Sequence, residues 1–129
     1  MAKSYSTMGL HFRYRLWIAE MNSHINIIRI FDDYITELSS KRHEPAVKKG
    51  IENFGTQFIE LRKQIDDLRH EMHLAKMALA AESKQSKGTG GGPIPKSIHA
   101  ALKRQYLRYR RLFERTKKEF AQFENKWLA

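Results

Sequence analysis

The six histidines and fourteen acidic residues of this chain are the side chains that could bind a metal ion or move protons. A di-metal site in a helical bundle needs Glu-x-x-His pairs on two helices, and the sequence contains none. Glu20 and His24 stand four residues apart, but Glu20 falls beside the apolar positions of its segment. His70 and His73 fall on the outward face of theirs. We therefore expect no metal site and no cofactor.

Patterns that support nucleophilic catalysis are also absent. The sequence has no Gly-x-Ser-x-Gly motif and no cysteine to act as a thiolate. Residues 87–92 are rich in glycine but lack the Gly-Lys-Ser/Thr ending of a phosphate loop. The pairs Asp32-Asp33 and Asp66-Asp67 are no acid/base dyads, because neighbours on a helix point about 100° apart. We predict that the protein is not an enzyme.

Arginine and lysine residues near the end of the chain form its most distinctive charge pattern. From residue 95 onward the sequence has ten Lys or Arg residues and only three Glu residues. One helical face there carries a stripe with no acidic residue in it: Arg104, Arg108, Arg111, Arg115 and Lys118. Three further basic residues flank it: Lys103, Arg110 and Lys117. The stripe would be about 21 Å long, which suits sequence-indifferent contact with nucleic-acid phosphates.

Two other interpretations of this stripe stay open. It can be solvated and have no partner, although an idle face more usually mixes both signs of charge. It can also pair within the protein, with acidic residues of the preceding helix: Glu60, Asp66, Asp67 and Glu71.

Three long helices must position these side chains. Apolar residues recur at alternating spacings of four and three residues in three segments, which is the pattern of packed coiled-coil helices. The first seam is Leu10, Tyr14, Trp17, Met21, His24, Ile28, Phe31, Ile35 and Leu38. The second is Val47, Ile51, Phe54, Phe58, Leu61, Ile65, Leu68, Met72, Ala75 and Leu79. The third is Leu102, Tyr106, Tyr109, Phe113, Thr116, Phe120, Phe123 and Trp127.

The breaks between the seams set the architecture. Pro45 suits the first turn of a helix, and residues 84–94 read as a flexible glycine-rich loop. We expect helices at about 6–40, 45–83 and 95–128. Helices joined in this way favour antiparallel neighbours. The predicted fold is therefore all-α, a single domain over 1–129 that forms an antiparallel three-helix bundle.

Two seam positions are polar, His24 and Thr116. If Leu38 faces Val47 across the first turn, His24 faces Leu61. If Leu79 faces the start of the third helix near Ile98, Leu61 faces Thr116, so His24 and Thr116 fall into the same layer of the core. A buried imidazole needs a hydrogen-bond partner, and a threonine hydroxyl can supply one. We predict that the two form a buried polar pair that fixes the register of the helices.

The first helix carries more apolar surface than a three-helix bundle needs. Leu16 and Ile30 lie beyond the seam and its flanks, and we expect them to form a homodimer contact. Our first functional hypothesis is therefore a non-enzymatic helical protein-interaction or scaffold module that associates with itself. The alternative is nonspecific nucleic-acid binding through the basic stripe. The sequence indicates no small-molecule substrate.

Several segments resemble a family of small, uncharacterised bacterial all-helical proteins. The resemblance rests on Leu10-His11-Phe12, Leu16-Trp17, Glu20, Ile51-Glu52-Asn53-Phe54, Gln57-Phe58-Ile59, residues 65–71, Phe113-Glu114, Phe120, Phe123 and Lys126-Trp127. It covers most of the chain apart from the glycine-rich loop. The resemblance implies the helical fold and no particular activity.

Composition indicates the charge of the partners and the cellular compartment. The 129 residues carry a net charge of +10, which favours anionic partners. The first seven residues lack the apolar core of a secretory signal, and no apolar run is long enough to span a membrane. The absence of cysteine fits a reducing compartment. We expect a cytoplasmic location.

Overall fold

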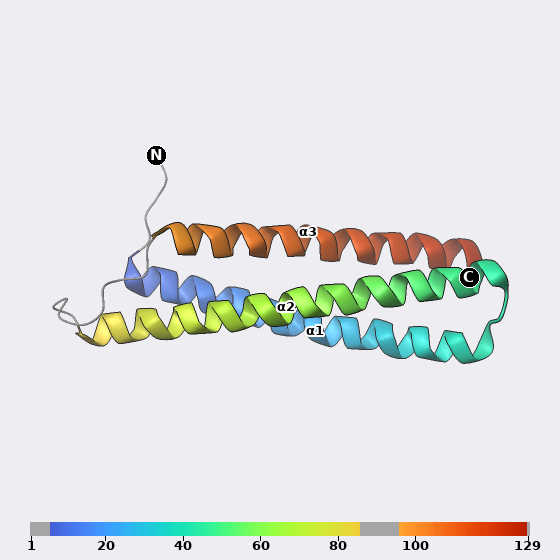
Figure 1. Cartoon of the computed structure of the whole chain (residues 1–129), viewed down its shortest axis with the longest axis horizontal. Helices are drawn as coiled ribbons and strands as arrows, with labels where there is room; N and C mark the ends of the chain where they lie inside the picture. Colours follow the sequence, from blue (N-terminus) through green and yellow to red (C-terminus); the bar gives the residue numbers. More distant parts are fainter. Residues whose placement is uncertain (1–5, 86–95, 129) are drawn as a thin grey trace.

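The computed structural model describes residues 6–85 and 96–128, which form three long helices (Figure 1). Helix α1 spans Thr7–Lys41, α2 spans Pro45–Gln85 and α3 spans Lys96–Trp127. The described residues contain no strand, so the predicted all-α three-helix fold is confirmed. The helix bounds differ from the predicted ones by at most two residues. Of the predicted loop at 84–94, the first two residues belong to α2, and the rest lies outside the described residues.

The ends of α1 are set by groups that satisfy its free backbone atoms. The side-chain oxygen of Ser6 accepts a hydrogen bond from the Gly9 amide at 3.0 Å, which is an N-cap. At the other end Arg42 leaves the helical conformation, with φ −120° and ψ 126°. The Arg42 amide still donates to the Leu38 carbonyl at 2.8 Å. Helix α2 then begins at Pro45, where the missing N–H removes no helical hydrogen bond.

One continuous core runs along the bundle and consists mainly of the predicted seam residues. Its aromatic centre is Phe120 of α3, whose ring lies against Phe31 of α1 and Phe54 of α2, with centroids 5.1 and 5.2 Å away. Trp127, the last residue of the third seam, is the exception because 41% of its surface is exposed. The periodic pattern therefore identifies the buried faces of all three helices.

The register of α1 against α2 differs from the predicted one by about one helical turn. The ring of Phe31 stacks on Phe58, with a centroid distance of 4.6 Å and an interplanar angle of 17°. Placing Leu38 opposite Val47 would instead have set Phe31 opposite Phe54. A heptad-like pattern changes little when one helix slides by a turn, so the spacing alone does not choose between the two registers.

Helix α2 runs antiparallel to both other helices, so α1 and α3 run parallel (Figure 1). Helix α2 contacts both α1 and α3 extensively, whereas the backbones of α1 and α3 approach each other less closely. Long and aromatic side chains fill the space between α1 and α3, among them Trp17 and Tyr106, whose ring centroids are 5.4 Å apart.

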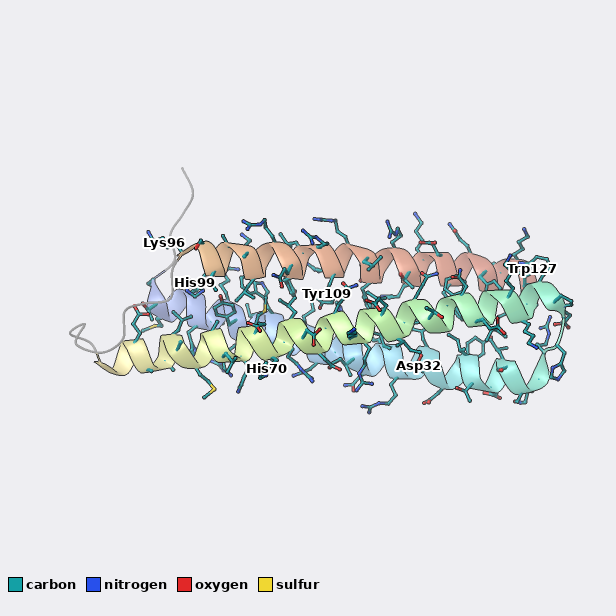
Figure 2. All side chains as sticks on the ribbon, in the orientation of Figure 1. Asp32, His70, Lys96, His99, Tyr109 and Trp127 are labelled. Carbon is teal, nitrogen blue, oxygen red and sulfur yellow. The ribbon has the colours of Figure 1, made fainter. Side chains whose placement is uncertain are left out.

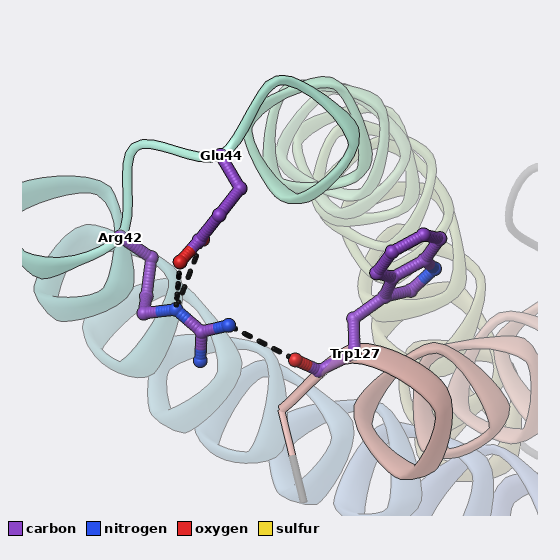
Figure 3. Close-up of polar contacts among 3 residues, drawn as sticks. All are labelled: Arg42, Glu44 and Trp127. Atoms are coloured by element: carbon purple, nitrogen blue, oxygen red, sulfur yellow. Dashed lines mark hydrogen bonds and ion pairs between the residues drawn. The ribbon is translucent and has the colours of Figure 1, made fainter.

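Arg42 lies in the α1–α2 connection and links it to the end of α3 (Figure 3). Its Nε donates to the Glu44 carboxylate at 3.0 Å, and its Nη2 donates to the Trp127 carbonyl at 3.1 Å. The second bond satisfies a carbonyl at the end of α3 that has no helical partner.

None of the three helices, within the described residues, has an apolar stretch of the length and hydropathy that crossing a membrane requires.

Candidate functional site

The outer side of α3 carries the predicted basic stripe, which we call the basic face: Arg104, Arg108, Arg111, Arg115 and Lys118. All five residues are exposed. Each lies two positions after a buried seam residue of α3, and this offset turns it away from the core. Figure 2 shows side chains with nitrogen at their tips along this outer edge of the bundle.

Most of the basic face has no ion-pair partner within the described residues. Arg115 is the exception, since its Nε lies 3.6 Å from the Glu119 carboxylate one turn along the same helix. The acidic residues of α2 that were candidate partners do not pair with the face. Asp66 instead pairs within α2, with Arg62 at 3.7 Å and Arg69 at 3.2 Å.

A shallow groove borders the basic face where α3 meets α2. Its lining includes Arg108 and Gln105 from α3 and Asp67 and Glu71 from α2. Neither carboxylate forms an ion pair with Arg108 among the described residues. The charges of the basic face are therefore not neutralised by the described part of α2.

Two of the three predicted flanking residues form ion pairs within the protein. The Arg110 Nε lies 3.0 Å from the Glu20 carboxylate of α1. Lys117 pairs with Glu114 at 3.7 Å, and its ammonium lies 5.2 Å from the centre of the Phe113 ring. Lys103 is exposed and extends the basic face. The anion-binding site is thus smaller than the eight residues that the sequence predicts, because Arg110 and Lys117 are already paired.

His24 is buried, as predicted, with 8% of its surface exposed, and Thr116 is buried too, with 1% exposed. The hydrogen bond of His24, however, is with Tyr109, whose hydroxyl lies 2.9 Å from Nδ1. The imidazole also stacks on Phe113, with centroids 4.0 Å apart. The predicted pairing with Thr116 is wrong as to partner, because the one-turn shift of α1 against α2 moves His24 towards Tyr109.

Burial lowers the pKa of His24, while the carboxylates of Glu20 and Glu114 act in the opposite direction. The imidazole is therefore neutral at physiological pH. Burial also raises the pKa of Tyr109 far above its usual value. Two neutral groups share the hydrogen bond, and neither leaves an unpaired charge in the core.

Two further polar contacts join α1 to α3. The Tyr106 hydroxyl donates to the Glu20 carboxylate, which also binds Arg110. Nearer the start of both helices, the Tyr14 hydroxyl and His99 Nδ1 form a hydrogen bond of 2.5 Å. Burial raises the pKa of Tyr14 to about 12. Burial lowers the pKa of His99, with Glu82 acting in the opposite direction.

These contacts form a ladder, which we call the α1–α3 polar ladder: Tyr14–His99, Glu20–Tyr106, Glu20–Arg110 and His24–Tyr109. The hydrogen-bonded partners are 85 or 86 residues apart, which is the signature of two parallel helices in fixed register. The ladder was not predicted from the sequence. The available signal was the presence of tyrosines at seam positions, because a buried tyrosine hydroxyl usually finds a hydrogen-bond partner.

The predicted dimer residues lie on the outside of α1. Leu16 is 47% exposed and Ile30 is 68% exposed. Ile30 stands at the edge of an open depression between α1 and α3, which is floored by Phe31 and Phe120. Both side chains are free to contact another molecule.

The described residues hold no group of three or more His, Asp or Glu side chains that could bind a metal ion. Comparison with known proteins adds no homologue: no family model, no curated protein and no solved structure matches this chain. A function must therefore be inferred from the surfaces described above.

Proposed function

We propose that this protein is a non-enzymatic helical binding module whose main surface is the basic face of α3, and that this face binds the phosphate backbone of nucleic acid. The observation that carries the proposal is the state of Arg104, Arg108, Arg111 and Lys118. These four residues are exposed and take part in no ion pair with the described chain.

The chemistry of the face favours phosphate groups. Four of its five residues are arginines, whose planar guanidinium groups can bind phosphate oxygens in a bidentate manner. The face is about 21 Å long, which matches several phosphates along one strand. No motif for reading base edges accompanies it, so the binding is expected to be indifferent to sequence.

Repulsion between the like charges of the unbound basic face also favours the binding of a polyanion. Like charges three or four residues apart on a helix destabilise it by about 0.2–0.5 kcal/mol per pair. The basic face contains a continuous series of such pairs. A bound polyanion would relieve this repulsion, and its condensed cations would be released into solution.

The test is fluorescence anisotropy of a labelled DNA duplex titrated with the protein at about 50 and about 200 mM salt. We expect micromolar binding that weakens steeply with salt. The double variant Arg108→Glu, Arg111→Glu should bind much more weakly. Replacing both arginines with Gln should reduce the slope of log K against log salt by about 2, which is about 1 for each residue.

The matched control is Lys49→Glu with Lys63→Glu, which changes the net charge equally at exposed positions of α2. It should retain most of the binding, because the altered charges lie outside the basic face. An equal loss in both double variants would show that only net charge matters. Absence of binding at low salt would refute the proposal.

A second function, self-association, is favoured by the exposed Leu16 and Ile30. Two large apolar side chains on one helix face are more stable when a partner covers them. Light scattering over a range of protein concentrations tests this directly. A monomeric mass at the highest concentration would refute self-association and would leave the nucleic-acid-binding proposal untouched.

A further inference from the structure

We propose that a second copy of this chain docks on α1, with the two α1 helices antiparallel and the two-fold axis beside Ser23. This inference rests on the self-association proposed above and specifies the surface and orientation of the partner. It is independent of the nucleic-acid-binding proposal.

The docking surface is a row of exposed residues on α1, which we call the outer seam: Phe12, Leu16, Ala19, Ser23, Asn26 and Ile30. They alternate at spacings of four and three residues, as in the buried seams. The fully buried residues Tyr14, Met21 and Ile28 mark the opposite side of the helix. Helix α1 thus has a packing pattern on the side that the bundle does not use.

The two large apolar residues on either side of the centre of the outer seam are equidistant from Ser23. Leu16 and Ile30 each stand seven residues from it, so antiparallel packing sets Leu16 of each copy against Ile30 of the other. The small side chains of Ala19 and Ser23 occupy the centre, where two helices that cross must come closest. The two large apolar contacts then lie on either side of that crossing.

Charge determines the orientation. Arg15 and Asp33 are exposed at opposite ends of the outer seam, and neither forms an ion pair within the described chain. Antiparallel docking brings Arg15 of one copy within about 3 Å, along the axis, of the level of Asp33 of the other. An arginine side chain spans that offset. Asp33 would then stand between Arg15 of the other copy and Arg29 of its own helix.

Parallel docking would be unfavourable for the same residues. It would set Asp33 against Asp33 of the other copy and separate Arg15 from Asp33, and it would also align the two helix dipoles. The apolar residues would make comparable contacts either way. The arrangement of the charges therefore favours the antiparallel pair.

The orientation can be tested by disulfide trapping, because the chain has no cysteine and each engineered thiol is the only one in its molecule. Proteins carrying Leu16→Cys and Ile30→Cys are mixed, oxidised and analysed by mass spectrometry. We expect the mixed disulfide, which joins one molecule of each variant, to exceed both homodimers. Ser23→Cys alone should form a homodimer. Thr56→Cys, at an exposed position of α2, is the control and should cross-link slowly.

The role of charge has its own test, which keeps all apolar residues intact. Arg15→Glu should weaken dimerisation about tenfold, because the symmetric dimer loses two exposed ion pairs. Combining Arg15→Glu with Asp33→Arg should restore it. Sedimentation equilibrium measures the dissociation constant in each case.

The outcomes separate the two levels of the proposal. A monomeric wild-type protein would overturn self-association and the docking mode together. A dimer in which none of the outer-seam cysteines cross-links faster than the Thr56→Cys control would overturn the docking mode alone. Preferential homodimers of Leu16→Cys and of Ile30→Cys would show parallel docking and overturn the antiparallel arrangement.

Discussion

At the scale of single residues, His24 shows how this core accommodates a polar group. Its ring stacks on Phe113 and so contributes apolar contact, while Nδ1 is hydrogen-bonded to Tyr109. The same arrangement of histidine and tyrosine occurs at Tyr14 and His99. Both pairs cross from α1 to α3, where the helix backbones approach less closely than at the other two interfaces. The pairs therefore specify the parallel register that apolar packing leaves loosely defined.

Tyr109→Phe should lower the free energy of unfolding by about 1–3 kcal/mol, because it leaves a buried imidazole nitrogen without its partner. A double-mutant cycle with His24→Ala should give a coupling energy of about 0.5–3 kcal/mol. The control cycle pairs His24→Ala with Thr116→Val. Chemical denaturation provides all of these values. A larger coupling to Thr116 than to Tyr109 would contradict the structural assignment.

The buried His24 and the half-buried His99 also predict a pH dependence of stability. Burial lowers the pKa of His24 and of His99 below the usual 6.5, so the unfolded chain takes up protons more readily than the folded one. Their contribution is fully present above 6.5 and is lost as the pH falls from there to the lowered folded-state pKa. The melting temperature should therefore decrease as the pH is lowered from about 7.5 to about 5.5.

The variant that carries both His24→Gln and His99→Gln tests this explanation. Its melting temperature should change much less over the same pH interval. His70→Gln, on α2 and outside the α1–α3 polar ladder, is the control and should retain the full effect. If the double variant keeps the wild-type pH profile, other groups are responsible.

At the scale of the helices, periodicity predicts what each element buries but not how the elements align. Apart from the exposed Trp127, the seams predicted for α1, α2 and α3 coincide with the core. The alignment of α1 with α2 depends on the conformation of the Arg42–Glu44 connection and on the fit of Phe31 against Phe58, and neither is visible in residue spacing. The one-turn difference is why the sequence predicted the polar character of the His24 layer but not its tyrosine partner.

The contact between α2 and α3 predicts opposite effects for two glycines of α2. A Cβ atom at Gly50 would overlap the Phe123 ring, which packs against Phe54 at 5.3 Å. Gly50→Ala should therefore destabilise the protein by about 1–3 kcal/mol, as overpacking usually does. At Gly55 the added methyl group would meet no described atom within 4 Å apart from the adjoining backbone of its own helix and its two chain neighbours. Gly55→Ala should stabilise by about 0.5–1 kcal/mol.

Thermal unfolding of the two glycine variants measures both effects against the same wild-type protein. Each substitution adds the same methyl group to the same helix, so intrinsic helix propensity is matched. A stabilising Gly50→Ala would mean that Phe123 moves aside at little energetic cost and that the α2–α3 contact is looser than its geometry indicates.

At the scale of the whole molecule, a net charge of +10 is distributed unevenly. The core and the α1–α3 polar ladder are electrically balanced, whereas the basic face of α3 concentrates unpaired charge. Composition already indicated the excess of charge. The sequence did not reveal which basic residues would be neutralised inside the fold, because Arg110 meets Glu20 only after α1 and α3 align.

Moderate salt should therefore stabilise this protein. Raising chloride from about 20 to about 300 mM screens the repulsion along the basic face, so the melting temperature should rise. The variant Arg108→Gln, Arg111→Gln should respond less to salt and should melt at a higher temperature at low salt. A melting temperature that falls with added salt would mean that attractive ion pairs dominate.

Because two of the three described helices run in one direction and one in the other, the bundle has a net helix dipole as well as a net charge. Two antiparallel helices largely cancel their macrodipoles, but α1 and α3 run parallel, so the equivalent of one helix dipole remains, about half an elementary charge at each end. The negative pole lies where α1 and α3 end, and Arg42 there binds the Trp127 carbonyl. This residual dipole acts within about one turn of each end, so an anion that reaches the end where α1 and α3 begin meets its positive pole.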